Sequence, residues 1–340
     1  MTEPGTEIDS WRDRALQLDA SANQIMVGQQ RAVRLLLLAT FARGHVLLEG
    51  DVGVGKTTLL QTLARGIGGA FERIEGTVDL MPSDLLYYTY VTRDGQPRVE
   101  AGPLLKHGPD LSIFFFNEIN RARPQVHSLM LRAMAERHVN AFNTEHRFPH
   151  LQVFADRNRV EREETFEIPA AVRDRFFMEI TIEMPDDPAL LRELMVDTRY
   201  HDVAALINEM EPATVPFHEL NDVAARIQAS VGTSETLLRY ALDLCAATRN
   251  PAAFGIELAG VTAAELVQAG ASPRGMSMLL RAARVAAWLA GRSEVVPEDI
   301  HTVFEPTIAH RIFFNPIYEM RRSEIVGPFT SAILEAVASP

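Results

Sequence analysis

The sequence contains almost no lysine and almost no cysteine. Two of its 33 Lys and Arg residues are lysines, at positions 56 and 106, and Cys245 is the single thiol in 340 residues. A lone cysteine excludes disulfides within the chain and metal sites built from several thiolates. Because Cys245 lies in the apolar stretch 240–247, which has the character of a helix, we expect a buried structural thiol.

Long apolar runs are also missing. No window of 18 uninterrupted apolar residues occurs, so a membrane-spanning helix is not expected. The acidic and polar start of the chain, residues 1–7, lacks the cations and the apolar stretch of a secretory signal. We therefore expect a cytoplasmic protein that does not insert into membranes.

The chain also lacks an excess of positive charge. The net charge is -12 and the isoelectric point is near 5.4. Nucleic-acid binding depends on stripes of Lys and Arg, and none is evident, so no nucleic-acid partner is expected. The ten histidines are scattered without carboxylate or cysteine partners at metal-ligand spacing, which favours solvated or hydrogen-bonded roles. What remains is a soluble globular chain, 47% hydrophobic, of a length that suits two domains.

One of the two lysines completes a phosphate-binding loop. Residues 50–57 read Gly-Asp-Val-Gly-Val-Gly-Lys-Thr and fit the pattern G-x-x-x-x-G-K-[ST]. Glycines let backbone amides approach a phosphate at the start of a helix, and the compact ammonium of Lys56 reaches between phosphates where a guanidinium would be too wide. The Thr57 hydroxyl is a typical magnesium ligand. The residues expected to bind nucleotide here are Gly50, Gly53, Val54, Gly55, Lys56, Thr57 and Thr58.

The periodicity of apolar residues predicts an α/β fold followed by helices. Strands are expected at 45–49, 71–75, 111–116 and 151–155, helices at 56–66 and 125–136, and a hairpin around Asn143. From residue 189 to 337 nearly all the spacing is helical. We expect a flexible tail or a peripheral helix at 1–20, a parallel-sheet core flanked by helices at 21–186, and an all-α domain at 187–340.

An irregular segment interrupts the core at about 76–109. It is rich in Gly, Pro, Tyr and charge and is predicted to be an insertion rather than a core element. Its tyrosines Tyr87, Tyr88 and Tyr90 either form a surface for a partner or anchor the insertion, and anchoring is the commoner role of aromatic side chains.

A second nucleotide motif is expected at the end of the apolar strand 111–116. The usual pair there is Asp-Glu, whereas this chain has Asn117 and Glu118. The Asn117 amide oxygen can hold a metal-bound water but supplies no negative charge. Glu118 is the candidate general base that polarises an attacking water, the alternative being an ordinary acid after a strand.

Taken together, the motifs resemble the AAA+ ATPases and, within them, the MoxR family. The segments that carry the resemblance are 45–57, with Val52 where proline is usual, 79–84, 102–104, 118–122, 153–176, 270–274 and 310–312. They extend over about residues 22–315. The resemblance implies an AAA+ P-loop core followed by a helical lid, with ATP and Mg²⁺ as cofactors and Thr57 and Asn117 on the metal side.

The resemblance also implies roles for residues outside the loop. Asn158 matches the position called sensor 1, which aligns the attacking water opposite Glu118. Arg175 matches an arginine finger that reaches a neighbouring subunit's γ-phosphate, with Arg173 a weaker candidate, and Arg274 matches sensor 2 on the lid. Gly28 lies in the stretch that flanks adenine. For each arginine, a surface salt bridge is the alternative.

A finger that acts on a neighbour implies a ring, which is a hexamer in the family. The resemblance further suggests a partner with a von Willebrand factor A domain and a client oxidoreductase, for example in the maturation of a methanol dehydrogenase. Asn117, and Asp156-Arg157-Asn158-Arg159 in place of Thr-Gln-Asn-Pro, predict slow or conditional hydrolysis. The alternative functions are a nucleotide-gated assembly scaffold, a magnesium-chelatase-like subunit and a DNA motor. The acidic net charge argues against the last of these.

Overall fold

The computed structural model describes residues 4–157 and 166–340. The chain forms two compact units, and each is described by itself. The sheet unit comprises residues 13–175 and 180–221, and the helical unit comprises residues 1–12, 176–179 and 222–340.

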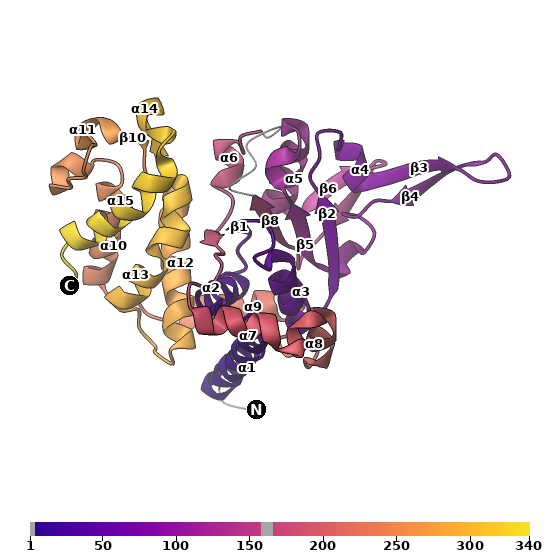
Figure 1. Cartoon of the computed structure of the whole chain (residues 1–340), viewed down its shortest axis with the longest axis horizontal. Helices are drawn as coiled ribbons and strands as arrows, with labels where there is room; N and C mark the ends of the chain where they lie inside the picture. Colours follow the sequence, from indigo (N-terminus) through magenta and orange to yellow (C-terminus); the bar gives the residue numbers. More distant parts are fainter. Residues whose placement is uncertain (1–3, 158–165) are drawn as a thin grey trace. The chain divides into compact units, whose positions relative to one another are not determined.

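A five-stranded sheet forms the centre of the sheet unit, with strand order β2-β5-β8-β1-β9 (Figure 1). The first four pair in parallel, so their carboxyl ends share one edge. β5 is buried along its whole length, because both of its faces are covered. This confirms the parallel sheet predicted from the sequence. The strands are β1 (Val46–Glu49), β2 (Ala70–Glu75), β5 (Leu111–Asn117), β8 (Gln152–Arg157) and β9 (Met178–Thr181).

The helices of this part of the chain match the predicted ones closely where the apolar spacing is strong. The expected helices 56–66 and 125–136 are α3 and α5, each within one residue of the predicted bounds. The helices are α2 (Gln30–Phe41), α3 (Lys56–Ile67), α4 (Pro82–Leu86), α5 (Pro124–Glu136), α6 (Ala170–Arg173), α7 (Pro188–Val196), α8 (Val203–Glu209) and α9 (Leu220–Ser230), the last of which crosses from one unit to the other.

The N-terminal segment is a helix rather than a flexible tail. α1 (Pro4–Ile25) buries Trp11, Ala15 and Leu18, which recur at helical spacing on one face. Leu18 packs so closely against α3 that a Cβ on Gly66 would lie 2.2 Å from its Cδ1 atom. Of the two forms expected for this segment, a flexible tail or a peripheral helix, the structure has the helix from Pro4 onward.

The boundary between the units falls at residues 221 and 222, whereas the sequence predicted it near 186. The segment 208–217 stays with the sheet unit because it is bonded to the end of α3. The backbone amides of Ala213, Val215 and Phe217 donate to the carbonyls of residues 65, 66 and 67 at 2.8–3.0 Å. Arg65 adds side-chain bonds to two further carbonyls of this segment. These backbone contacts have no signature in the side-chain pattern of the sequence.

The insertion at 76–109 contains a hairpin, β3 (Tyr87–Val91) and β4 (Pro97–Ala101), that projects beyond the sheet (Figure 1). Tyr87 anchors its base, with its ring centroid 4.8 Å from that of Phe142. Phe142 lies in the turn of a second hairpin, β6 (His138–Ala141) and β7 (Thr144–Arg147), as expected around Asn143. Tyr88 and Tyr90 are about half exposed. Anchoring therefore describes Tyr87 and not its neighbours.

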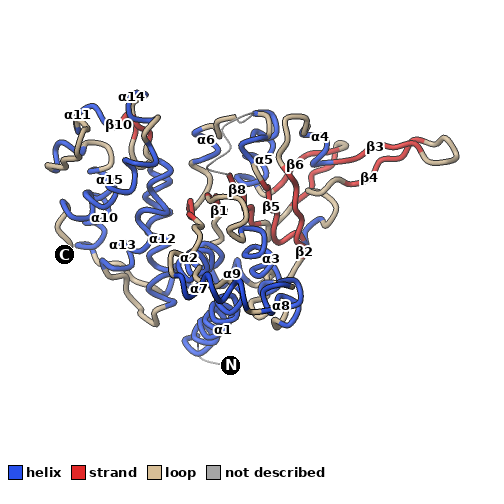
Figure 2. The backbone as a smooth tube through the Cα atoms, viewed as in Figure 1, coloured by secondary structure: helices blue, strands red, loops and turns tan. Residues whose placement is uncertain are grey.

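The helical unit confirms the predicted all-α second domain, with one small addition (Figure 2). The addition is a two-stranded antiparallel sheet of β10 (Val267–Ala269) and β11 (Phe313–Phe314). The helices are α10 (Glu235–Ala247), α11 (Ala263–Leu266), α12 (Pro273–Leu289), α13 (Pro297–Ile308), α14 (Pro316–Glu319) and α15 (Arg322–Ala336). Among the described residues, no helix is both long enough and apolar enough to cross a membrane.

Cys245 lies inside the helical unit, on α10, and only 1% of it is exposed. Burial raises the pKa of its thiol to about 12. The thiolate is the reactive form of cysteine, and at neutral pH it is almost absent here. The sequence-based prediction of an inert structural thiol agrees with this position.

We predict that the native protein at pH 8 resists labelling by a thiol-specific disulfide reagent, while the urea-unfolded chain reacts with one equivalent. The reason is that both access and ionisation of Cys245 require its surroundings to open. The measurement is the absorbance of the released chromophore against time. Stoichiometric labelling of folded protein within minutes would show that Cys245 is not held in this way.

Candidate nucleotide site

The predicted phosphate-binding loop lies between β1 and α3. Gly53 and Gly55 have φ values of 82° and 89°, in the left-handed region that favours glycine. Gly50 has another constraint, because a Cβ there would lie 2.3 Å from the carbonyl oxygen of Ile182. Among the described residues, no side chain caps the start of α3 and no acid lies in its first turn. An exposed helix N-terminus of this kind favours an anion.

Lys56 is held under the loop by two oxygen atoms. Its Nζ atom donates to the Gly50 carbonyl at 2.8 Å and lies 2.9 Å from Oδ2 of Asp156. The exposed fractions of the two side chains are 9% and 1%. Lys56 and Asp156 thus form a buried ion pair that joins α3 to the carboxyl end of β8.

Asp156 lines this site but was not predicted as a site residue from the sequence. Burial raises the pKa of its carboxyl, while the hydrogen bond from Lys56 and the one from the backbone amide of Glu118 lower it in part. Its Oδ1 atom accepts that Glu118 amide at 2.5 Å, and its Oδ2 atom, apart from the ion pair, accepts no well-formed hydrogen bond among the described residues. The available signal was positional: β8 ends at the same edge as β1 and β5.

β5 ends at Asn117, one residue beyond the predicted strand 111–116, and Glu118 follows it; each of the two residues has a charged neighbour. The Asn117 amide nitrogen donates to Oε1 of Glu75 at 2.8 Å across the β2–β5 pair. Glu118 adopts the left-handed region, with φ 53° and ψ 49°, and its Oε2 atom lies 3.0 Å from Nη1 of Arg121. The Oε2 atom of Glu75 also lies 3.2 Å from Nη2 of Arg73. The sequence did not single out Glu75 or Arg121.

These residues surround one cavity of about 430 Å³. The size is within the range of small-molecule sites. The lining comprises Val52, Gly53, Gly55, Lys56, Thr57, Thr58, Glu75, Asn117, Glu118 and Asp156. The structure therefore brings the loop, the end of β5 and the end of β8 together around one polar space.

Of the other predicted residues, Gly28, Gly50, Val54 and Arg175 are not among the residues that line this cavity. Gly28 precedes α2 with φ 74°, and a Cβ there would lie 2.5 Å from Cγ of Pro185. Gln29 beside it donates to the Glu183 carbonyl at 2.5 Å, which fixes the stretch 27–29 against 183–185. Asn158 lies outside the described residues. Arg175 follows α6, whose last residue is Arg173.

Arg274 is the second residue of α12 in the helical unit, behind the N-cap Ser272. The next residue, Gly275, lies under the side chain of Arg311, whose Cδ atom would be 2.6 Å from a Cβ at that position. Arg311 is 1% exposed, and its guanidinium donates to the carbonyls of Phe176, Phe177 and Thr307. One buried arginine thus joins the start of α12 to the two residues that follow Arg175.

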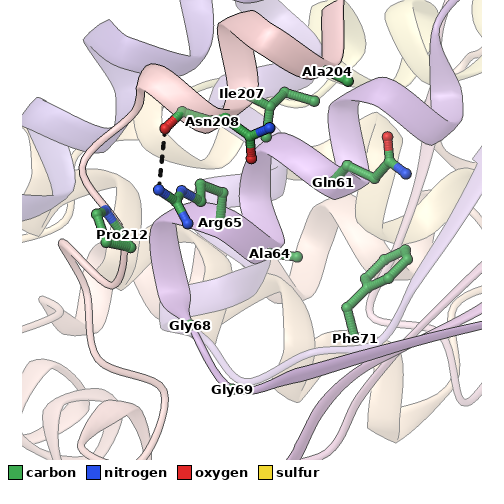
Figure 3. A pocket seen from close by; sticks show the side chains of 10 residues that line it. All are labelled: Gln61, Ala64, Arg65, Gly68, Gly69, Phe71, Ala204, Ile207, Asn208 and Pro212. Atoms are coloured by element: carbon green, nitrogen blue, oxygen red, sulfur yellow. Dashed lines mark hydrogen bonds between the residues drawn. The ribbon is translucent and has the colours of Figure 1, made fainter.

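A second pocket, of about 410 Å³, lies at the other end of α3 (Figure 3). Its lining comes from α3, α8 and the residues around them, and Arg65 donates to the Asn208 carbonyl at its edge. Its lining contains no acid, and its two glycines, Gly68 and Gly69, follow a helix rather than precede one. Among residues 4–157 and 166–340, no group of three or more His, Cys, Asp or Glu side chains is arranged to hold a metal. The site of interest is therefore the cavity at the start of α3.

A parallel sheet whose first strand leads through a glycine loop to a lysine and a helix defines a P-loop nucleotide-binding protein. Comparisons with known proteins make the class narrower. Residues 45–178 match the model of the ATPase family associated with various cellular activities, and residues 261–328 match an AAA lid domain. A crystal structure of a candidate ATPase from Cytophaga hutchinsonii superposes with a TM-score of 0.81, at 29% identity, over 99% of this chain and 98% of that one.

Relatives with assigned names cover nearly the whole chain. Protein MoxR of Methylorubrum extorquens is 56% identical over 98% of this chain and 97% of its own length. Protein MoxR of Paracoccus denitrificans is 52% identical, over 98% and 99% respectively. Chaperone MoxR1 of Mycobacterium tuberculosis is 32% identical over 93% of this chain and 80% of its own. The chain belongs to the MoxR family of AAA+ ATPases.

We predict that Lys56→Ala lowers the free energy of unfolding of the nucleotide-free protein by about 3 kcal/mol, since removing one partner leaves the other as an uncompensated buried charge. The double variant Lys56→Ala/Asp156→Asn is expected to recover more than half of that loss. Urea unfolding followed by circular dichroism measures both. If the two substitutions are simply additive, the ion pair contributes nothing to the fold.

Proposed function

We propose that this chain is an ATP-dependent chaperone whose hydrolysis is slow or conditional. Family membership supports ATPase activity in general. The observation that carries the finer proposal is the cavity in which Lys56, Thr57, Asn117 and Glu118 meet at the start of α3. Its uncapped helix N-terminus suits the phosphates, and Lys56 is placed to move from Asp156 to them.

The residues present also fit a magnesium ion. Thr57 offers a hydroxyl, Asn117 an amide and Asp156 a buried carboxylate oxygen whose close partner is the Lys56 ammonium, at 2.9 Å. Oxygen donors with retained waters are what Mg²⁺ prefers. When bound, the ion would neutralise charge on the phosphates. Thr57 and Asn117 would hold it.

Glu118 is the proposed base that polarises the attacking water, with Asn158 aligning that water. Glu118 is paired with Arg121, and Asn117 supplies no charge to the metal side. Both features support restrained turnover. They also favour the second candidate function, a scaffold that assembles on binding ATP and for which hydrolysis is not needed.

We propose that Arg175 completes the site of a neighbouring subunit and that Arg274 acts on the nucleotide of its own subunit. Assembly into a ring, a hexamer as in the family, follows from a finger that acts in trans. The projecting hairpin β3–β4, with Tyr88 and Tyr90 about half exposed, is the proposed contact for a client.

Two of the relatives carry the name MoxR and one is named a chaperone. On that basis we propose that the client is a cofactor-dependent oxidoreductase such as a methanol dehydrogenase. A protein with a von Willebrand factor A domain is the proposed partner.

Hydrolysis is tested with Glu118→Gln, which keeps the size of the side chain and removes its basicity. We predict loss of steady-state phosphate release with ATP binding retained, because only the water-activating group changes. Asn117→Asp, which adds the missing carboxylate, is expected to release phosphate several-fold faster than the wild type. If Glu118→Gln matches the wild type in turnover and supports client maturation, the scaffold function is the correct one.

Action in trans is tested by mixing two inactive variants. Arg175→Ala rings and Glu118→Gln rings are each expected to be inactive, whereas rings assembled from both regain phosphate release. In a mixed ring, a subunit with intact Glu118 lies next to one with intact Arg175. Light scattering with and without ATP verifies the assembly. If mixing restores no activity although mixed rings form, Arg175 does not act on a neighbour.

A further inference from the structure

Three neighbouring strands end at the same level around the cavity. In the register of the sheet Glu75 on β2 lies opposite Asn117 on β5, and Phe116 on β5 lies opposite Ala155 on β8. Asp156 therefore follows on the other side of Asn117. The position that lacks a charge is flanked by a carboxylate on each adjacent strand.

The two carboxylates differ in burial and in their contacts. The Glu75 side chain is 54% exposed and its oxygens contact Arg73 and the Asn117 amide. The Asp156 side chain is 1% exposed and faces Lys56. Charge interactions are strong where water is excluded and weak where it is present, so Asp156 has the larger effect on a ligand in this cavity.

Nucleotide binding at Lys56 would change the surroundings of Asp156. Lys56 is the residue expected to contact the phosphates, and a single ammonium cannot neutralise both a polyphosphate and the buried carboxylate. Without a cation, bound ATP and Asp156 would repel each other across the cavity. A divalent cation between them removes that repulsion and replaces the charge that Lys56 withdraws.

We propose that Asp156 is the metal-side carboxylate of this site, displaced by one strand from the position of Asn117, and that it makes tight ATP binding conditional on a divalent cation. The inference rests on the proposed function, since it assumes that ATP binds at Lys56. A role that was predicted from the sequence for the end of β5 alone thereby extends to β8.

The test compares ATP affinity with excess Mg²⁺ and with EDTA, measured by isothermal titration of the full-length protein with a slowly hydrolysed ATP analogue. For the wild type, Mg²⁺ is expected to tighten binding at least about tenfold, which corresponds to one strong charge interaction. For Asp156→Asn, the affinity in EDTA should rise and the Mg²⁺ effect should fall to about twofold or less. An unchanged Mg²⁺ effect in Asp156→Asn overturns the proposal.

Glu75→Gln is the matched variant, because it removes the same charge from the other flanking strand. It is expected to keep most of the Mg²⁺ effect, since Glu75 is more than half exposed. If it reduces the effect as much as Asp156→Asn does, the cause is the total charge of the cavity and not Asp156.

A double variant that moves the carboxylate from β8 to β5 distinguishes a charge effect from a folding defect. Asp156→Thr is expected to lose the Mg²⁺ effect, and Asp156→Thr/Asn117→Asp is expected to regain it, because the carboxylate then lies on β5. Failure of the double variant to regain the effect, with circular dichroism like that of the wild type, contradicts the proposal. If instead the wild type binds no ATP with or without Mg²⁺, it is the proposed function that fails.

Discussion

The buried ion pair between Lys56 and Asp156 is the interaction on which the rest of the site depends. It joins the start of α3 to the end of β8, and through the Glu118 amide it also reaches the end of β5. Two charges taken out of water are stable only if they pair closely, so the three elements must keep their spacing. The same pair places the Lys56 ammonium next to the space where phosphates are expected. To contact a phosphate there, Lys56 would exchange the Asp156 carboxylate for it.

The carboxyl edge of the sheet explains why chemistry gathers at this place. Parallel strands deliver their last residues to one side, and the apolar bodies of β5 and β8 fix the register between them. Polar residues at the strand ends are thereby neighbours although they are distant in sequence. Asn117 lies in the middle, with Glu75 on one neighbouring strand and Asp156 on the other. On the proposal that Asp156 is the metal-side carboxylate, this is a redistribution of charge among neighbouring strands rather than a loss.

Much of this was accessible from the sequence, for identifiable reasons. The glycine loop, the apolar strand before Asn117 and the helical period after residue 189 are local signals, and each appears in the structure where it was expected. Asp156 and Glu75 were missed as site residues because their importance arises from strand order, which places β8 and β2 on either side of β5. The unit boundary at 221 was missed for a similar reason, since backbone hydrogen bonds from 213–217 to α3 have no signature in side-chain pattern.

Arg311 contacts Phe176 and Phe177 through their backbone carbonyls and Gly275 through the bare face of a glycine, and it also contacts the side chains of His310 and Met278. Substitutions at Phe176 or Phe177 therefore keep the carbonyl groups that accept its hydrogen bonds. An inserted or deleted residue between Arg175 and Phe177, or between Arg274 and Gly275, would instead shift Arg175 or Arg274 relative to the contacts of Arg311. The hydrogen bonds of Arg311 therefore constrain the length of the chain here, whereas the burial of Phe176 and Phe177 constrains its composition. Engineering of these two segments should accordingly exchange residues one for one.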